Sequence, residues 1–150
     1  FTGEVVASAR FEVLVPARSK ADVAIGFDLP EGRSDLALVA TANEAVRAVK
    51  LLVEDVEADL PVPAFTASVT ATDTGAEASI TAQTFLRSLA IFPDRVAEDA
   101  YADSLGVDLF PGETHSFQVT GNFDEGSLEA LTAPEVVRFV TVEKRPAGVW

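Results

Sequence analysis

A single histidine limits the chemistry available to this chain. His115 is the only imidazole in 150 residues, and cysteine is absent. Zinc sites built on two histidines or on thiolates are therefore excluded. No serine stands beside His115 in a recognisable nucleophile pattern. Because His115 shares strand parity with Phe117 and Val119, we expect it at the rim of the core, in a structural or surface role.

Carboxylates are the second group that could do chemistry, and they gather in two clusters. Neither cluster has the alternating ligands, central glycine and terminal glutamate of a calcium loop. A carboxylate pair could hydrolyse glycosides, but only across a substrate cleft, which a small β-sandwich does not obviously provide. We expect solvated faces, with a hard-cation site at the domain junction as the alternative. The first cluster is Glu54, Asp55, Glu57 and Asp59, and the second is Asp94, Glu98, Asp99, Asp103 and Asp108.

Composition narrows the range of partners. The net charge of -13 argues against nucleic acid, whose backbone carries the same sign. The nine glycines are dispersed, without GxGxxG or GxxxxGK[ST], so we expect no nucleotide cofactor. A membrane-spanning helix needs roughly 20 consecutive apolar residues, and charged residues interrupt every apolar run before it reaches that length. We therefore expect no membrane span. The lack of cysteine fits the cytosol and the exterior alike.

The elements that must carry these side chains are predicted to be strands. Residues 65–72 and 76–83 alternate apolar with polar side chains on either side of Asp73-Thr74-Gly75. Period-two alternation around a glycine-containing turn is typical of a β-hairpin with one face in the core. Further strands are expected at residues 85–92, 107–110, 115–120 and 136–142, with short helical turns within 94–104 and 127–130.

The first sixty residues show the same pattern. Strands are expected at residues 4–15, 23–27, 36–41 and 45–53. Helix propensity offers an alternative for residues 45–57, but residues 42–44 resemble a hairpin turn and favour the strand. Leu60-Pro61-Val62-Pro63 cannot continue a central strand and predicts a short stiff linker.

A repeated motif suggests how the chain is divided. Residues 14–19 (LVPARS) and 109–114 (LFPGET) share one pattern and lie 95 positions apart (109 less 14), about the length of one immunoglobulin-like sandwich, roughly 100 residues. We therefore expect a partial immunoglobulin-like unit in residues 1–60, a linker at 61–63 and an immunoglobulin-like β-sandwich at 64–150. We expect the first unit to be a piece of a longer domain, with an open strand edge through which it self-associates or packs on the second unit.

Two motifs carry a resemblance to a known family. Residues 86–96 (LRSLAIFPDRV), followed by 109–114 (LFPGET), resemble the C-terminal region of β-mannosidases of glycoside hydrolase family 2. Residues 51–61 resemble the end of the preceding immunoglobulin-like domain of those enzymes. The resemblance implies an accessory β-sandwich that packs on a catalytic barrel, in an enzyme that removes terminal β-linked mannose from non-reducing ends. The catalytic glutamates of that family belong to its barrel, and no position here matches them.

Two function classes therefore stand at this point. The first is a non-catalytic accessory domain of a glycosidase, with no catalytic, cofactor-binding or metal-binding residue of its own. The second is a free-standing binding module, for carbohydrate or of the adhesin type. A sugar platform usually uses an exposed Trp or Tyr, and Tyr101 and Trp150 are the only such residues.

Overall fold

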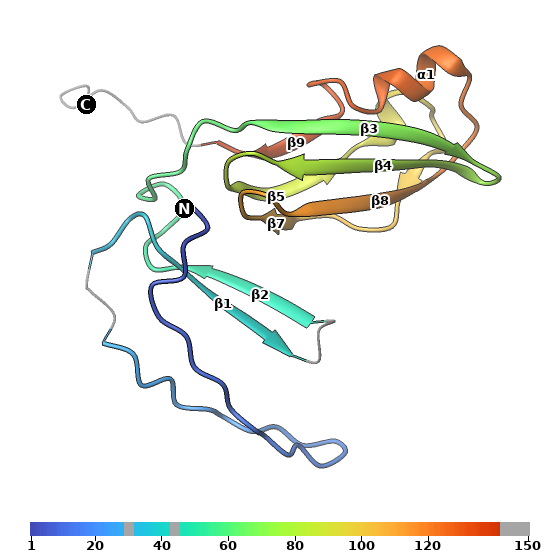
Figure 1. The fold of residues 1–150 in the computed structure, drawn as a ribbon. Helices are drawn as coiled ribbons and strands as arrows, with labels where there is room; N and C mark the ends of the chain where they lie inside the picture. Colours follow the sequence, from blue (N-terminus) through green and yellow to red (C-terminus); the bar gives the residue numbers. More distant parts are fainter. Residues whose placement is uncertain (29–31, 43–45, 142–150) are drawn as a thin grey trace.

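The computed structural model describes residues 1–28, 32–42 and 46–141, and nearly all regular structure in these ranges is β-strand (Figure 1). The strands pair antiparallel throughout these ranges. The fold is all-β and sandwich-like, as the alternating polarity predicts. The elements are β1 (Ala37–Ala42), β2 (Val46–Leu51), β3 (Phe65–Thr72), β4 (Gly75–Ala82), β5 (Leu86–Ile91), η1 (Pro93–Arg95), β6 (Tyr101–Ala102), β7 (Val107–Leu109), β8 (Thr114–Thr120), α1 (Glu125–Ala130) and β9 (Val137–Val140).

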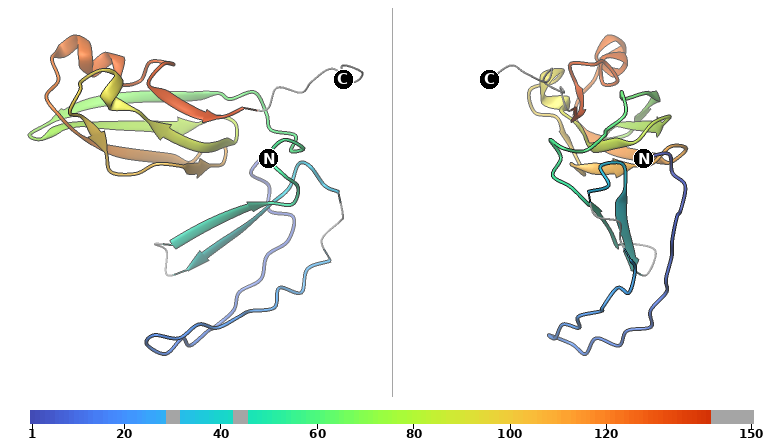
Figure 2. Two further views of the ribbon diagram at one scale, coloured as in Figure 1. Left: turned by 180° about the vertical axis from the view of Figure 1, so that it is seen from behind. Right: turned by 90° about the vertical axis from the view of Figure 1, so that its left-hand side faces the viewer.

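Two sheets form the sandwich. One has the strand order β3-β4-β8-β6 and the other β7-β5-β9, and they lie face to face in Figures 1 and 2. Side chains from both sheets meet in one core between them, because each strand directs alternate residues inward. The buried members are Ala76, Ala78, Ile80, Ala82, Leu86, Leu89, Ile91, Leu109, Phe117, Val119, Leu131, Val136 and Val137.

The predicted hairpin is confirmed, but its turn is Asp73-Thr74, and Gly75, expected in the turn, is the first residue of β4. β3 and β4 pair from Phe65 opposite Ala82 to Thr72 opposite Gly75. All four inward residues of β4 are buried, but in β3 only Phe65 and Val69 are even partly buried. The expectation that Ala67 and Ala71 also line the core is wrong. β3 is the edge strand of its sheet, and Ala67 and Ala71 are exposed on it.

The later strands also follow the prediction, with one addition. β5, β7 and β9 fall within the expected ranges, and β8 begins one residue before its expected range. η1 and α1 overlap the expected helical turns and begin one and two residues before them. Residue 142, the last of the expected strand 136–142, lies outside the described residues, as do 143–150. The two-residue strand β6 was not predicted, because a ladder this short leaves no alternation to detect.

In the first unit, half of the expected strands form. β1 and β2 make a two-stranded sheet, so the helical alternative for residues 45–57 is wrong. Residues 4–15 and 23–27 form no ladder within the described ranges, so those two strand predictions are wrong. The alternating pattern is present, but no described strand lies alongside to accept its backbone hydrogen bonds. Residues 1–28, called the N-terminal arm below, loop out from the body of the molecule and return (Figures 1 and 2).

The two copies of the repeated motif both form turns. In the first, Ser19 N donates to Pro16 O over 3.2 Å, and Arg18 takes a φ of 61°. In the second, Glu113 N donates to Phe110 O over 3.0 Å, with Gly112 at a φ of 85°. The two turns are offset by one residue, because the residue with positive φ follows the proline by two positions in the first and by one in the second.

Candidate functional site

His115 lies at the rim of the core, as expected. Its ring meets that of buried Phe117 edge-on, with centroids 4.6 Å apart. Its Nε2 lies 3.0 Å from Ser104 Oγ, a contact that the sequence did not indicate because Ser104 comes from the loop after β6. The Ser104 hydroxyl also lies 3.0 Å from Asp103 Oδ1. In a catalytic triad the carboxylate accepts a hydrogen bond from the histidine, which in turn contacts the serine. Here Asp103 contacts Ser104 instead, and within the described ranges no carboxylate is hydrogen-bonded to the other nitrogen of His115. The three side chains therefore do not form a catalytic triad.

Several members of the two acidic clusters make structural contacts. Asp59 accepts a short hydrogen bond from Ser34, and Asp55 lies 3.5 Å from Arg87. Asp103 accepts from the backbone N of Gln118 over 3.1 Å. Within the described residues no three acidic, histidine or cysteine side chains gather as a metal site would require. The alternative of a hard-cation site at the junction therefore has no ligand set in this part of the chain.

One carboxyl has a strongly shifted pKa, but it lies on the surface. Arg33 donates two hydrogen bonds to Asp35, of 2.6 and 2.7 Å. These bonds lower the pKa of Asp35 from its usual 3.8 to about 2. The same carboxylate raises the pKa of Arg33. An exposed ion pair of this kind stabilises the turn before β1 and supplies no acid or base for catalysis near neutral pH.

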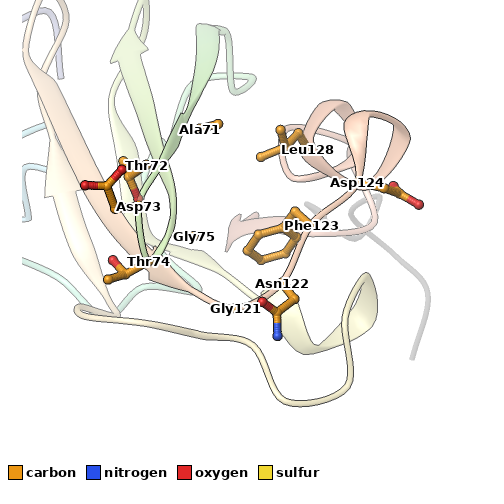
Figure 3. Close-up of a pocket in the computed structure, with 10 residues that line it drawn as sticks. All are labelled: Ala71, Thr72, Asp73, Thr74, Gly75, Gly121, Asn122, Phe123, Asp124 and Leu128. Carbon is orange, nitrogen blue, oxygen red and sulfur yellow. The ribbon is translucent and has the colours of Figure 1, made fainter.

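A shallow hollow of about 470 Å³ lies between the β3–β4 turn and the loop before α1 (Figure 3). Its floor is formed by Ala71, Phe123 and Leu128, which point toward one another. The carboxylates of Asp73 and Asp124 point away from it. Asp124 caps α1 by accepting from Ser127 N over 2.7 Å, which lowers its pKa. Thr72, Thr74 and Asn122 also line the hollow, but neither carboxylate at its edge points into it to fix a sugar in place.

Tyr101, one of the two aromatic residues considered for sugar binding, does not line this hollow. Tyr101 is 61% exposed on edge strand β6, which pairs with the opposite side of β8 from β4. Trp150 lies outside the described residues. The described residues therefore do not place a second Trp or Tyr beside Tyr101 as a sugar-binding platform.

The most elaborate set of contacts lies where the first unit meets the sandwich. Phe85, in the loop between β4 and β5, is buried there and stacks on Phe1 with ring centroids 4.8 Å apart. The Phe110 ring packs against Phe85 at a tilt of 42°, with centroids 4.7 Å apart. Leu51 and Ala58 complete this second buried cluster. Each ring comes from a distant part of the chain, so the stack ties the N-terminus, the loop after β4 and the end of β7 together.

Charged residues reinforce the same region. Asp108 Oδ2 accepts from Arg87 Nη1 over 2.6 Å, and Oδ1 accepts from Ser88 N over 2.7 Å at a point where Ser88 has a φ of 51°. Arg87 Nη2 reaches Asp55 of the first unit over 3.5 Å, beside a groove of about 760 Å³ along β2 and residues 52–57. Within the described chain, Arg87 Nε is buried without a hydrogen-bond partner. Asp108 thus holds both the β5 bulge and the arginine that crosses to the first unit.

A third contact uses the repeated motif. Glu113 Oε2 accepts from Phe110 N over 2.7 Å and from Arg47 Nη1 of β2 over 2.9 Å. The Arg47 guanidinium lies 5.3 Å from the centre of the Phe110 ring. We call these three sets of contacts the junction: Phe1, Phe85, Phe110, Arg87, Asp55, Asp108, Arg47 and Glu113.

Comparison with known proteins adds no name to this arrangement. A scan against family models found no match, and neither did a search of curated proteins. No helix in the described part of the chain is long and apolar enough to cross a membrane. The geometry of the junction is therefore the basis for a functional interpretation.

Proposed function

We propose that this chain is a non-catalytic accessory β-sandwich of a β-mannosidase-like glycoside hydrolase, and that its role is to pack on and stabilise the catalytic barrel. The parent enzyme would remove terminal β-linked mannose from non-reducing ends. The proposal rests on the resemblance in residues 86–96 and 109–114 and is supported by what those residues do in the fold.

The observation that carries it is the use of the motif residues as structural ties. Arg87, Phe110 and Glu113 all belong to the motifs, and all three bridge the sandwich to the first unit. Arg95 of the same motif donates to Glu135 O over 2.6 Å and lies over the Phe92 ring. These motif residues stabilise contacts between parts of the fold, which is what a domain with a structural role requires.

An activity assay and the surrounding reading frame test the proposal together. The purified 150-residue chain should give no turnover of a chromogenic β-mannoside, and the open reading frame that contains it should encode a barrel with paired glutamates. Turnover by the chain alone, or a reading frame without a barrel, would overturn the proposal. The Arg87→Ala variant should remain equally inactive, which guards against a contaminating hydrolase.

A free-standing carbohydrate-binding module is the second candidate, favoured only by the hollow beside Phe123. Aromatic rings do serve as sugar platforms, and Phe123 is partly exposed there. Calorimetric titration with mannose and manno-oligosaccharides tests this candidate. Saturable binding that Phe123→Ala removes would favour the module, whereas no heat up to millimolar sugar would eliminate it.

A further inference from the structure

Exposed apolar side chains are concentrated in the first third of the chain. Ten of the fifteen large apolar residues that are exposed in the described ranges lie within residues 1–51. Leu14 is 90% exposed and Val5 is 75% exposed. Single exposed apolar residues are normal on a protein surface, but a concentration of them in one region is unusual. The ten are Val5, Val6, Phe11, Val13, Leu14, Val15, Val23, Ile25, Val39 and Val46.

The small sheet β1–β2 has apolar side chains on both faces, with Arg47 on the inner face and Lys50 on the outer face. Leu51 and Val49 on its inner face belong to the buried cluster around Phe85. The register places Ala42 opposite Val46 and Ala40 opposite Ala48 on the outer face, and Val46 is 65% exposed. The described chain leaves the apolar part of the outer face, around Val46, uncovered.

The total exposed area supports the same conclusion. A compact folded monomer of 15.8 kDa exposes about 7,300 Å² by the usual scaling with mass, whereas this chain exposes 10680 Å². The difference, about 3,400 Å², is about four times the roughly 800 Å² that each partner contributes to a standard interface. The total includes residues 29–31, 43–45 and 142–150, and even a part of the difference is enough area for a standard interface.

The N-terminal arm supplies strands that lack a ladder. Residues 7–15 alternate apolar with mostly polar side chains, and the Pro16–Ser19 turn reverses the chain between this segment and residues 23–27. Both β1 and β2 have a free edge, since each pairs only with the other. Strand donors and strand edges are thus both present in the first unit, unpaired within the described ranges.

The first unit carries little net charge on the N-terminal arm and on β1–β2, which favours contact between two copies through this surface. The chain carries -13 overall, but residues 1–28 hold four carboxylates against three cations, and β1 and β2 carry only Arg47 and Lys50 as charged residues. Most of the negative charge lies on the sandwich instead. Two copies that approach through their first units therefore meet with the least repulsion.

We propose that a second copy of this chain covers the first unit, in a symmetric dimer that joins the N-terminal arms and the outer faces of β1–β2. The same patch faces itself across a two-fold axis, so the strand donor of each copy reaches the free edges of the other. This inference goes beyond the accessory function proposed above and does not rest on it, because it concerns the chain alone.

The mass of the purified chain in solution tests the proposal. Light scattering after size exclusion, from about 1 to 200 µM, should give twice 15.8 kDa in the upper part of that range. Val46→Asp should weaken dimerisation by about tenfold or more, because it places a charge in an apolar interface. Leu105→Asp is the matched control, since Leu105 is equally exposed at 65% but lies on the sandwich, and it should leave the mass unchanged.

Hydrogen exchange provides a second readout that does not depend on a variant. Amides of residues 4–15 should exchange more slowly as the protein concentration rises, while those of β4 should not change. A monomer over the whole concentration range would overturn the proposal. Equal weakening by Val46→Asp and Leu105→Asp, with unchanged circular dichroism, would also overturn it, because the association would then lie elsewhere.

Discussion

Asp108 and Asp55 face the same arginine but should differ in importance. The Asp108 side chain is 11% exposed and accepts two hydrogen bonds, whereas that of Asp55 is 45% exposed and lies 3.5 Å from Arg87. Asp108→Ala would leave Arg87 partly buried without its nearer partner and the Ser88 amide without an acceptor. We expect a loss of about 2–4 kcal/mol for Asp108→Ala and about 0–1 kcal/mol for Asp55→Ala in urea unfolding. Equal losses would show that Asp108 has no special role.

The Arg33–Asp35 pair predicts a specific acid response. Because the folded-state pKa of Asp35 is about 2 and its usual value is 3.8, the fold favours the ionised carboxylate. Its stabilising contribution is complete above about pH 4 and is lost as the pH falls through about 2. Carbon-detected NMR titration should place the Asp35 midpoint near pH 2, and Arg33→Ala should return it toward 3.8. A midpoint near 3.8 in the unaltered chain would contradict this.

At the scale of elements, the β3–β4 hairpin depends on one glycine. Gly75 has a φ of 153°, and a Cβ there would lie 2.1 Å from Val119 O on β8. We expect Gly75→Ala to cost about 3 kcal/mol or more, because β4 cannot move from β8 without breaking the sheet. Thermal unfolding followed by circular dichroism measures the loss.

Two other glycines separate the causes of that loss. Gly112 has a φ of 85° with nothing within 4 Å of a Cβ, so Gly112→Ala should cost only about 1 kcal/mol for the backbone conformation. Gly26 has open space and no positive φ, so Gly26→Ala should change stability by less than about 0.5 kcal/mol. The order Gly75, Gly112, Gly26 is the prediction, and a different order would contradict it.

The strands differ in how well the alternation of polar and apolar residues predicted them. β4 could be predicted to within one residue at each end because it is a central strand, in which each residue of the alternating pattern faces either the core or the solvent. β3 has the same alternation, but whether its apolar side is covered depends on the width of the opposite sheet. Ser88 and the bulge in β5 left no signal, because a buried run such as residues 89–91 is apolar whatever its register.

At the scale of the whole molecule, the two buried clusters predict separable behaviour. Phe85 belongs to the junction cluster, and Phe117 belongs to the sandwich core. Phe85→Ala should cost about 3–5 kcal/mol, as deletion of a buried aromatic ring does, and should act mainly on the first unit. Hydrogen exchange should show faster opening of β1 and β2 with β4 and β8 still protected. Phe117→Ala, the matched control, should expose β4 and β8 instead.

The division into a unit at residues 1–60 and a sandwich at 64–150 stays a prediction. The sandwich core is contained within β4 to β9 and the loops between them, which agrees with it. The junction cluster, however, takes Phe1 and Leu51 from one side and Phe85 and Phe110 from the other. The boundary at Pro61–Pro63 is therefore crossed by packing that the linker itself does not reveal.

The sequence alone determined that this protein is built from strands, where its main hairpin turns and which residues of β4 are inward, because alternation and turn chemistry are local properties of neighbouring residues. Only the tertiary structure decided that residues 4–15 have no ladder in the described chain, that Ser104 meets His115 and that Arg87 joins Asp108 to Asp55. Those outcomes depend on which distant strands lie side by side, and each strand's own polarity is compatible with several neighbours.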